Sequence, residues 1–223
     1  SIQLDPADRE ALQSSSPNEV EAVAGSKPWV NILCRFSDSS GVTPNPASYF
    51  SGLFGSTYPG LDNYWQAASF NNINLQGTTT TGWYDLPHPR SYYVYDSDQD
   101  GADEADLGRL FTDCTAAADP AVYFPNYIGV NLAFNGSLDG YAWGGTWYAS
   151  LDGQSRVYST TWLPPWGYQN QCVLAHEMGH GFGLPHSSGS YGNTYDSPWD
   201  VMSNSWASSL RSSQYGTVGV YTI

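Results

Sequence analysis

Residues 176–186 read HEMGHGFGLPH, and three of the chain's four histidines fall within this short stretch. Positions four apart lie on one face of a helix, so His176 and His180 can present imidazole nitrogens to one metal ion. Gly183 can end that helix in a left-handed conformation, and the resulting turn would bring back His186 as a third ligand. Three protein ligands with one open position are typical of a catalytic zinc site, whereas structural zinc sites are closed.

Glu177 supplies a candidate general base beside these metal ligands. It follows His176 directly, so its carboxylate can flank the metal without binding it. From there it can accept a proton from a water molecule whose pKa zinc lowers to about 7. A pair of histidines at this spacing is often only a polar helix face, but the glycine turn and the third histidine favour a zinc site. The stretch therefore predicts one catalytic zinc ion with Glu177 as a general base.

The same residues resemble the consensus H-E-x-x-H-x-x-G-x-x-H of the metzincin metallopeptidases. Metzincins also have a methionine-containing turn beneath the metal, and YDSPWDVMS (residues 195–203) is similar to it, with Met202 as the floor methionine. The resemblance implies an α+β fold: an upper subdomain of twisted mixed sheet and helices, including the zinc-binding helix, then an irregular lower subdomain with a short C-terminal helix. It also implies a zinc metalloendopeptidase, in which Glu177 is the general base toward a zinc-activated water.

A weaker resemblance links this chain to immune inhibitor A-type and gametolysin-type secreted peptidases. It is carried by SYFSGLFGS (48–56), DNYWQAASFNNINLQG (62–77) and GWYDLP (82–87). Several immune inhibitor A relatives have an acidic residue at the position of His186, so the chain departs from that pattern. Some metzincins place a phenol near the metal; here both Tyr191 and Tyr195 are candidates, and their spacing selects neither.

The hydrophobic patterns predict strands and helices in mixed order before an irregular tail. The run WVNILCRF (29–36) is short, apolar and rich in β-formers, as in a buried strand. The patterns predict further strands over 72–84, 91–95, 127–134, 141–149 and 155–162, and helices over 45–55, 63–69, 107–118, 169–183 and 205–216. Residues 1–28 have no sustained apolar pattern, so we interpret them as an N-terminal arm or propeptide remnant. Residues 29–223 then form a single catalytic domain, with its upper half ending at about residue 183.

The composition excludes several other functions. The 223 residues include 7 Lys or Arg and 21 Asp or Glu, for a net charge of −14, and 15% are aromatic. Such an anionic chain is poorly suited to bind nucleic acid or an anionic membrane surface. No stretch approaches the ~18 apolar residues of a membrane span, so we expect no membrane insertion. The lightly charged, Tyr- and Ser-rich composition indicates a secreted, extracellular protein, which we expect to be a monomer.

An acidic segment, DSDQDGADEAD (96–106), opens like a calcium loop. Carboxylates at its first, third and fifth positions and glycine at the sixth are typical of such loops, but Leu107 stands where an EF-hand needs glutamate. Alternatively, the acids only favour the start of the following helix through its dipole. The repulsion among six acids favours structural calcium. The candidate ligands are Asp96, Asp98, Asp100, the carbonyl of Ala102, Glu104 and Asp106.

The three cysteines allow at most one internal disulfide. Cys114 and Cys172 both lie on predicted helices that can pack together, so we expect a disulfide between them. Cys34 lies in a predicted strand and is expected to be a buried thiol, although spacing alone does not decide the pairing. Cys172 is not expected to bind zinc, because three histidines already suffice.

A second class of function remains open from the residues alone. Domains rich in tyrosine and tryptophan with few charges often bind sugars, so the alternative is a secreted zinc-containing carbohydrate- or protein-binding module without turnover. The combination of three histidines and one glutamate favours the enzyme, because a binding module has no reason to hold it. The expected partners are therefore protein or peptide substrates.

Overall fold

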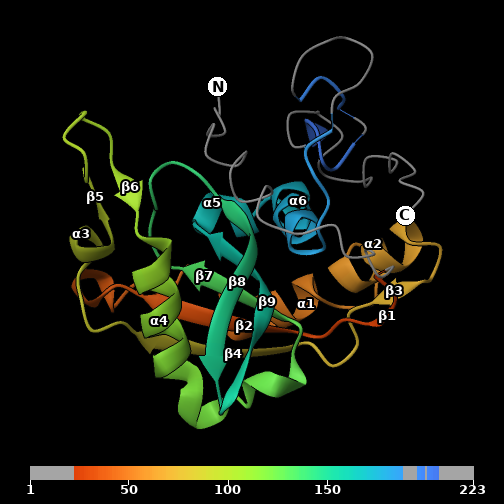
Figure 1. The fold of residues 1–223 in the computed structure, drawn as a ribbon, viewed down its shortest axis with the longest axis horizontal. Helices are drawn as coiled ribbons and strands as arrows, with labels where there is room; N and C mark the ends of the chain where they lie inside the picture. Colours follow the sequence, from red (N-terminus) through yellow and green to blue (C-terminus); the bar gives the residue numbers. More distant parts are fainter. Residues whose placement is uncertain (1–22, 188–194, 199, 206–223) are drawn as a thin grey trace.

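The computed structural model describes residues 23–187, 195–198 and 200–205, and a five-stranded mixed sheet lies at its centre (Figure 1). Its strands, in spatial order, are β4 (Thr79–Asp85), β2 (Trp29–Arg35), β7 (Gly129–Phe134), β9 (Gln154–Leu163) and β8 (Trp143–Leu151). The first four pair in parallel, while β8 runs antiparallel to β9 at the edge of the sheet. The expected α+β fold with a mixed sheet is confirmed.

Helices α4 (Leu107–Ala118) and α6 (Gln171–Gly181) cover opposite faces of this sheet (Figure 1). Successive side chains of a strand point to opposite faces. Accordingly, Trp29 and Leu33 of β2 pack in the core that includes α6, and Val30 and Ile32 pack in the core that includes α4. The strand is buried on both sides, which explains why its sequence is a continuous apolar run.

Shorter elements complete the fold. The helices are α1 (Ala47–Leu53), α2 (Leu61–Ala68), α3 (Arg90–Tyr93) and α5 (Pro165–Tyr168), and the short strands are β1 (Gly25–Ser26), β3 (Ile73–Asn74), β5 (Val94–Tyr95) and β6 (Glu104–Ala105). The strand predicted over 91–95 is wrong for its first three residues, because the helical turn α3 runs through them. The predicted C-terminal helix and most of the N-terminal arm lie outside the described residues. Of the helices that are described, none is long and apolar enough to cross a membrane.

The disulfide joins Cys34 of β2 to Cys114 of α4, with their Cα atoms 6.2 Å apart. The predicted pairing of Cys114 with Cys172 is therefore wrong, and so is the thiol predicted at Cys34. The reason is topological. Cys172 lies on α6 and packs on one face of the sheet, while Cys34 and Cys114 belong to the core on the other face. The sheet itself separates the two helices whose packing the prediction assumed.

Candidate metal centre

Helix α6 ends in a turn that reverses the chain directly after the second histidine. The N–H of Gly183 donates to the carbonyl of His180, and the N–H of Leu184 donates to the carbonyl of Gly179, both at 2.9 Å. Gly183 has φ +85°, in the left-handed region that a side chain disfavours. These two bonds form a Schellman motif, which satisfies the last carbonyls of the helix. The turn returns the chain toward α6 and places His186 beside the helix.

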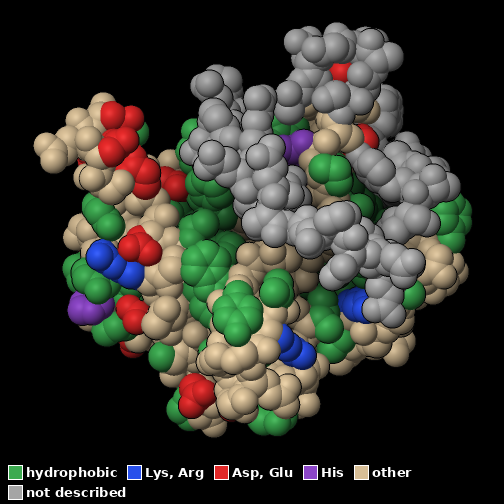
Figure 2. All heavy atoms as spheres, viewed as in Figure 1, with side chains coloured by type: hydrophobic (Ala, Val, Ile, Leu, Met, Phe, Trp, Pro, Cys, Tyr) green, Lys and Arg blue, Asp and Glu red, His purple; other side chains and the backbone are tan. Residues whose placement is uncertain are grey.

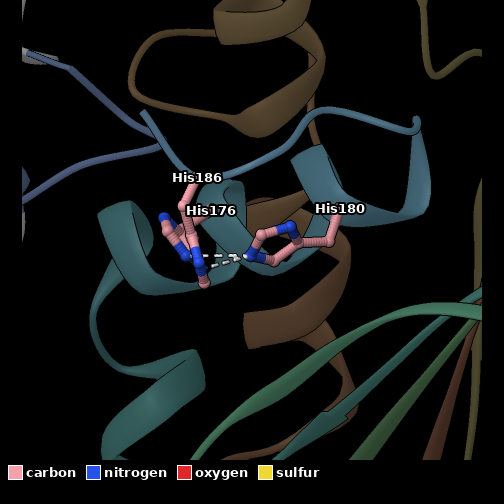
Figure 3. A group of neighbouring side chains, drawn as sticks. All are labelled: His176, His180 and His186. Atoms are coloured by element: carbon pink, nitrogen blue, oxygen red, sulfur yellow. Dashed lines mark hydrogen bonds between the residues drawn. The ribbon is translucent and has the colours of Figure 1, made fainter. Parts of the chain in front are cut away.

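The three histidine rings converge (Figure 3). Nε2 of His180 lies 3.1 Å from Nε2 of His176 and 2.9 Å from Nε2 of His186. A tetrahedral zinc ion with Zn–N bonds of 2.0–2.1 Å would hold its nitrogen ligands about 3.3 Å apart. The separations in the structure are close to this value, so the three side chains fit a single zinc ion.

Backbone carbonyls fix the orientation of the two helical rings. Nδ1 of His176 lies 2.6 Å from the carbonyl oxygen of Val201, and Nδ1 of His180 lies 2.9 Å from that of Leu184. A carbonyl can only accept, so Nδ1 is the protonated nitrogen of both rings and Nε2 carries the lone pair. Metal-binding histidines are commonly held in this way. Two lone-pair nitrogens 3.1 Å apart repel one another unless a cation lies between them.

Burial lowers the pKa of all three imidazoles. The pKa of His176 lies well below its usual value because the ring is desolvated and faces His180, and desolvation also lowers the pKa of His180. Desolvation, followed by the charge of His180, lowers the pKa of His186 to about 4. Metal binds the neutral imidazole. At neutral pH, protons therefore compete weakly with a metal ion at this site.

Met202 packs under the turn of α6 that carries the histidines. It is fully buried, and its sulfur occupies the space that a Cβ on Gly179 would need. The N–H of Ser187 donates to its carbonyl at 2.9 Å, and its neighbour Val201 supplies the carbonyl that holds His176. The methionine turn therefore packs against α6 through Met202 and orients His176 through the Val201 carbonyl.

Glu177 lies on α6 directly after His176 and is only 4% exposed. Its backbone packs against the edge strand β8, where Gly144 approaches it closely. The structure thus holds Glu177 on the same turn of helix as the first two histidines.

Tyr195 brings a phenol to the histidines. Its hydroxyl lies 2.8 Å from Nε2 and 3.0 Å from Nδ1 of His186, and the two ring centroids are 4.7 Å apart. The sequence offered Tyr191 equally, but that residue lies outside the described part of the chain. The spacing could not select Tyr195 because the selection depends on how the chain folds back after His186.

The acidic segment forms the tip of the projecting β5–β6 hairpin, where acidic side chains gather (Figure 2). The carboxylate oxygens of Asp96, Asp98, Asp100 and Glu104 lie within 4.8 Å of one another. Backbone N–H groups of the loop donate to each of these four side chains. The structure therefore brings together four of the six predicted calcium ligands.

Asp106 lies apart from this group. Its carboxylate accepts from the backbone N–H of Arg109 at 2.9 Å, which caps the start of α4, and it also pairs with the Arg109 side chain at 3.0 Å. This is the helix-start role that the sequence offered as the alternative to calcium binding. Ala102 donates its N–H to the Asp100 carboxylate at 2.8 Å, so its backbone lies beside this group.

The sheet order, the histidine triad and the methionine beneath it together define the class of protein as a metzincin-type zinc metallopeptidase. A comparison with protein families narrows this class. Residues 69–187, just over half of the chain, match metallopeptidase family M12B, reprolysin-like, and the chain belongs to this family. No curated protein matched the chain.

Family membership makes the chain a hydrolase that acts on peptide bonds, with proteins or peptides as substrates. Zinc is the typical metal of the family, and the histidine triad is suited to it. An enzyme is therefore favoured over the binding module without turnover. The matched region contains all three histidines and Gly183, whereas the methionine turn lies beyond it.

Proposed function

We propose that this chain is a secreted zinc endopeptidase that cleaves extracellular proteins. His176, His180 and His186 hold the zinc ion, and Glu177 is the general base. One observation carries the proposal: the two lone-pair Nε2 atoms of His176 and His180 face each other at 3.1 Å, while carbonyls hold their Nδ1 protons on the far side. This arrangement is unfavourable without a cation and is well suited to a zinc ion.

The proposed chemistry assigns two successive proton transfers to Glu177. When bound, zinc supplies a Lewis acid that polarises the scissile carbonyl and acidifies a water molecule. Glu177 accepts a proton from the attacking water and then delivers it to the nitrogen of the departing amine. Glu177 follows His176 directly in α6, so its carboxylate would flank a metal ion held by the histidines. Glu177 and His176 are buried, which limits the access of bulk water to these two residues.

We propose a third role for Tyr195. Negative charge develops on the carbonyl oxygen as the water attacks, and donors that are already in place stabilise this charge. The Tyr195 hydroxyl lies within hydrogen-bonding distance of His186 and therefore close to the metal position. We assign it as a donor to the developing oxyanion.

Secretion is supported by the disulfide between Cys34 and Cys114, because such bonds persist in oxidising compartments. The net charge of −14 is compatible with an extracellular setting and supports solubility. The test is to detect the protein in the culture medium and in washed cells of the native source. Recovery only inside the cells would contradict secretion.

Hydrolysis of denatured casein tests the proposed activity directly. The purified chain should cleave it at internal bonds, lose activity when 1,10-phenanthroline removes the metal, and regain it when one equivalent of zinc is added. Release of single residues from the chain ends would contradict an endopeptidase. Full activity in the metal-free protein would contradict the zinc mechanism.

We also propose that Asp96, Asp98, Asp100 and Glu104 bind a structural calcium ion, supported by their convergence on one point. Oxygen ligands of this kind suit calcium, and its charge would offset the repulsion among the four carboxylates. Calcium should therefore raise the melting temperature of the zinc-loaded protein, and EGTA should reverse this effect. The variant Asp98→Asn should respond less. An identical melting temperature with calcium and with EGTA, at constant zinc content, would contradict the proposal.

A further inference from the structure

A row of hydrogen-bonded polar side chains crosses the face of the sheet against which α6 packs. Asn31 of β2 donates to Thr80 of β4 at 3.1 Å, Asn131 of β7 donates to Asn31 at 2.9 Å, and Thr161 of β9 donates to Asn131 at 2.5 Å. The strand register makes these four residues direct neighbours, and Asn31, Asn131 and Thr161 are fully buried. The row therefore fills the same level of four adjacent strands on the face that α6 covers.

The fifth strand breaks this row with a glycine. Gly144 of β8 pairs with Thr161, so it occupies the next position along the row. A Cβ on Gly144 would lie 2.5 Å from the Cα and 2.7 Å from the carbonyl carbon of Glu177, and it would also overlap the Glu177 carbonyl oxygen. Real side chains do not approach so closely. The space that a side chain would fill on β8 is taken by the backbone of Glu177.

The opposite side of this helical turn also packs against a buried residue. Gly179, two residues after Glu177, packs against Met202, whose Cε would lie 3.2 Å from a Cβ on Gly179. His176 is also held by its bond to the Val201 carbonyl. The turn of α6 that carries Glu177 is therefore clamped between the edge strand on one side and the methionine turn on the other. It cannot move away from β8 as a rigid unit without displacing buried groups.

We infer that Gly144 is a positioning residue for the general base Glu177. Glycine lets the edge strand contact the Glu177 backbone directly. Backbone carbonyls orient His176 and His180 independently of this contact. The contact therefore sets the position of the Glu177 carboxylate relative to a zinc ion held by the histidines. Relief of the overlap from a Cβ would require a local shift of roughly 1 Å. A shift of this size in a reacting group can lower the rate about 10²-fold. The inference rests on the proposed function.

The adjacent glycine provides a matched control. A Cβ on Gly145 would meet nothing within 4 Å, although this residue lies next to Gly144 in the same strand. We would measure kcat and KM for a fluorogenic peptide, zinc content and melting temperature for wild type, Gly144→Ala and Gly145→Ala. Gly144→Ala should lower kcat about 10²-fold, with KM within about threefold of wild type and one zinc ion per chain. Gly145→Ala should keep kcat within about threefold of wild type, because its Cβ enters open space.

Three other outcomes would overturn the inference. If Gly144→Ala retains wild-type kcat, the contact does not position the base. If Gly144→Ala loses zinc or does not fold, Gly144 has a structural role and not a positioning one. An equal loss of kcat in both variants would show that β8 tolerates no added side chain here, so contact with Glu177 would not be the cause. Inactivity of the zinc-loaded wild type would instead contradict the proposed function, which separates the two failures.

Discussion

The hydroxyl of Tyr195 lies 2.8 Å from Nε2 of His186, the nitrogen that also lies 2.9 Å from His180. A phenol and two imidazoles therefore meet at one point, although Tyr195 lies well after the end of α6 in the sequence. The same nitrogen cannot bond the phenol and a metal ion at once. When Nε2 of His186 binds a metal ion, the Tyr195 hydroxyl must therefore give up this bond, and it then lies beside the metal.

Replacement of Tyr195 by phenylalanine should lower kcat more than it affects metal binding. Loss of one donor to an oxyanion typically costs about 10²–10³ in kcat. We expect a fall toward the lower end of this range with one zinc ion retained per chain, measured by peptide hydrolysis and metal analysis. Tyr123→Phe is the matched control, because Tyr123 is 54% exposed and lies outside the metal site. Equal kcat values for the two variants would contradict the assigned role.

Replacement of His186 by alanine should weaken zinc binding itself, because it leaves only the two helical histidines as ligands. We expect the variant to lose zinc to a chelator concentration at which wild type stays loaded, as monitored by equilibrium dialysis. His88→Ala is the matched control, because His88 is the histidine outside the motif and packs against the Tyr92 ring. Equal zinc affinity in both variants would remove His186 from the ligand set.

The metal-free chain should become less stable as the pH falls from about 6.5 to about 4. The unfolded histidines have a pKa of about 6.5, whereas burial lowers the pKa of His186 to about 4. In this window the unfolded chain binds more protons than the folded chain. The free energy of unfolding therefore decreases as the pH is lowered. Urea titrations of the EDTA-treated protein at pH 7 and pH 5 measure the effect. An equal decrease in His186→Ala would show that His186 contributes nothing to it.

Removal of the disulfide by Cys34→Ala together with Cys114→Ala should destabilise the fold but spare the metal site. Loss of a native bridge typically costs about 2–5 kcal/mol, and this one joins β2 to α4 on the face away from α6. Urea unfolding gives the stability, and metal analysis should still find one zinc ion per chain. Cys172→Ala should cost less, since Cys172 is outside the bridge. A loss of stability in Cys172→Ala as large as that in the double variant would favour the Cys114–Cys172 pairing, because both changes would then break the bridge.

The sequence could predict the cluster of three histidines because its geometry is local. His176 and His180 are one helical turn apart, and the left-handed Gly183 decides where His186 returns. Both relations follow from backbone geometry within a few residues. The central strands were predictable for a similar reason, since burial on both faces leaves a continuous apolar run such as that of β2.

Features that depend on tertiary contacts were beyond the sequence. The pairing of Cys34 with Cys114 required knowing that α4 and α6 lie on opposite faces of the sheet. The contact of Gly144 with Glu177 joins residues far apart in the chain, and a glycine in a strand carries no sign of what occupies its vacant space. Tyr92 and Tyr93 have strand-forming side chains, but tertiary context places them in the helical turn α3.

The zinc content and activity of Glu177→Ala test the central claim most directly. The variant keeps all three histidines, so it should bind one zinc ion per chain with the wild-type fold. Loss of a general base typically costs about 10²–10⁴ in rate, and casein hydrolysis should fall accordingly. Glu177→Gln, which preserves the shape of the side chain, should show the same loss. Wild-type hydrolysis by either zinc-loaded variant would contradict the proposed mechanism.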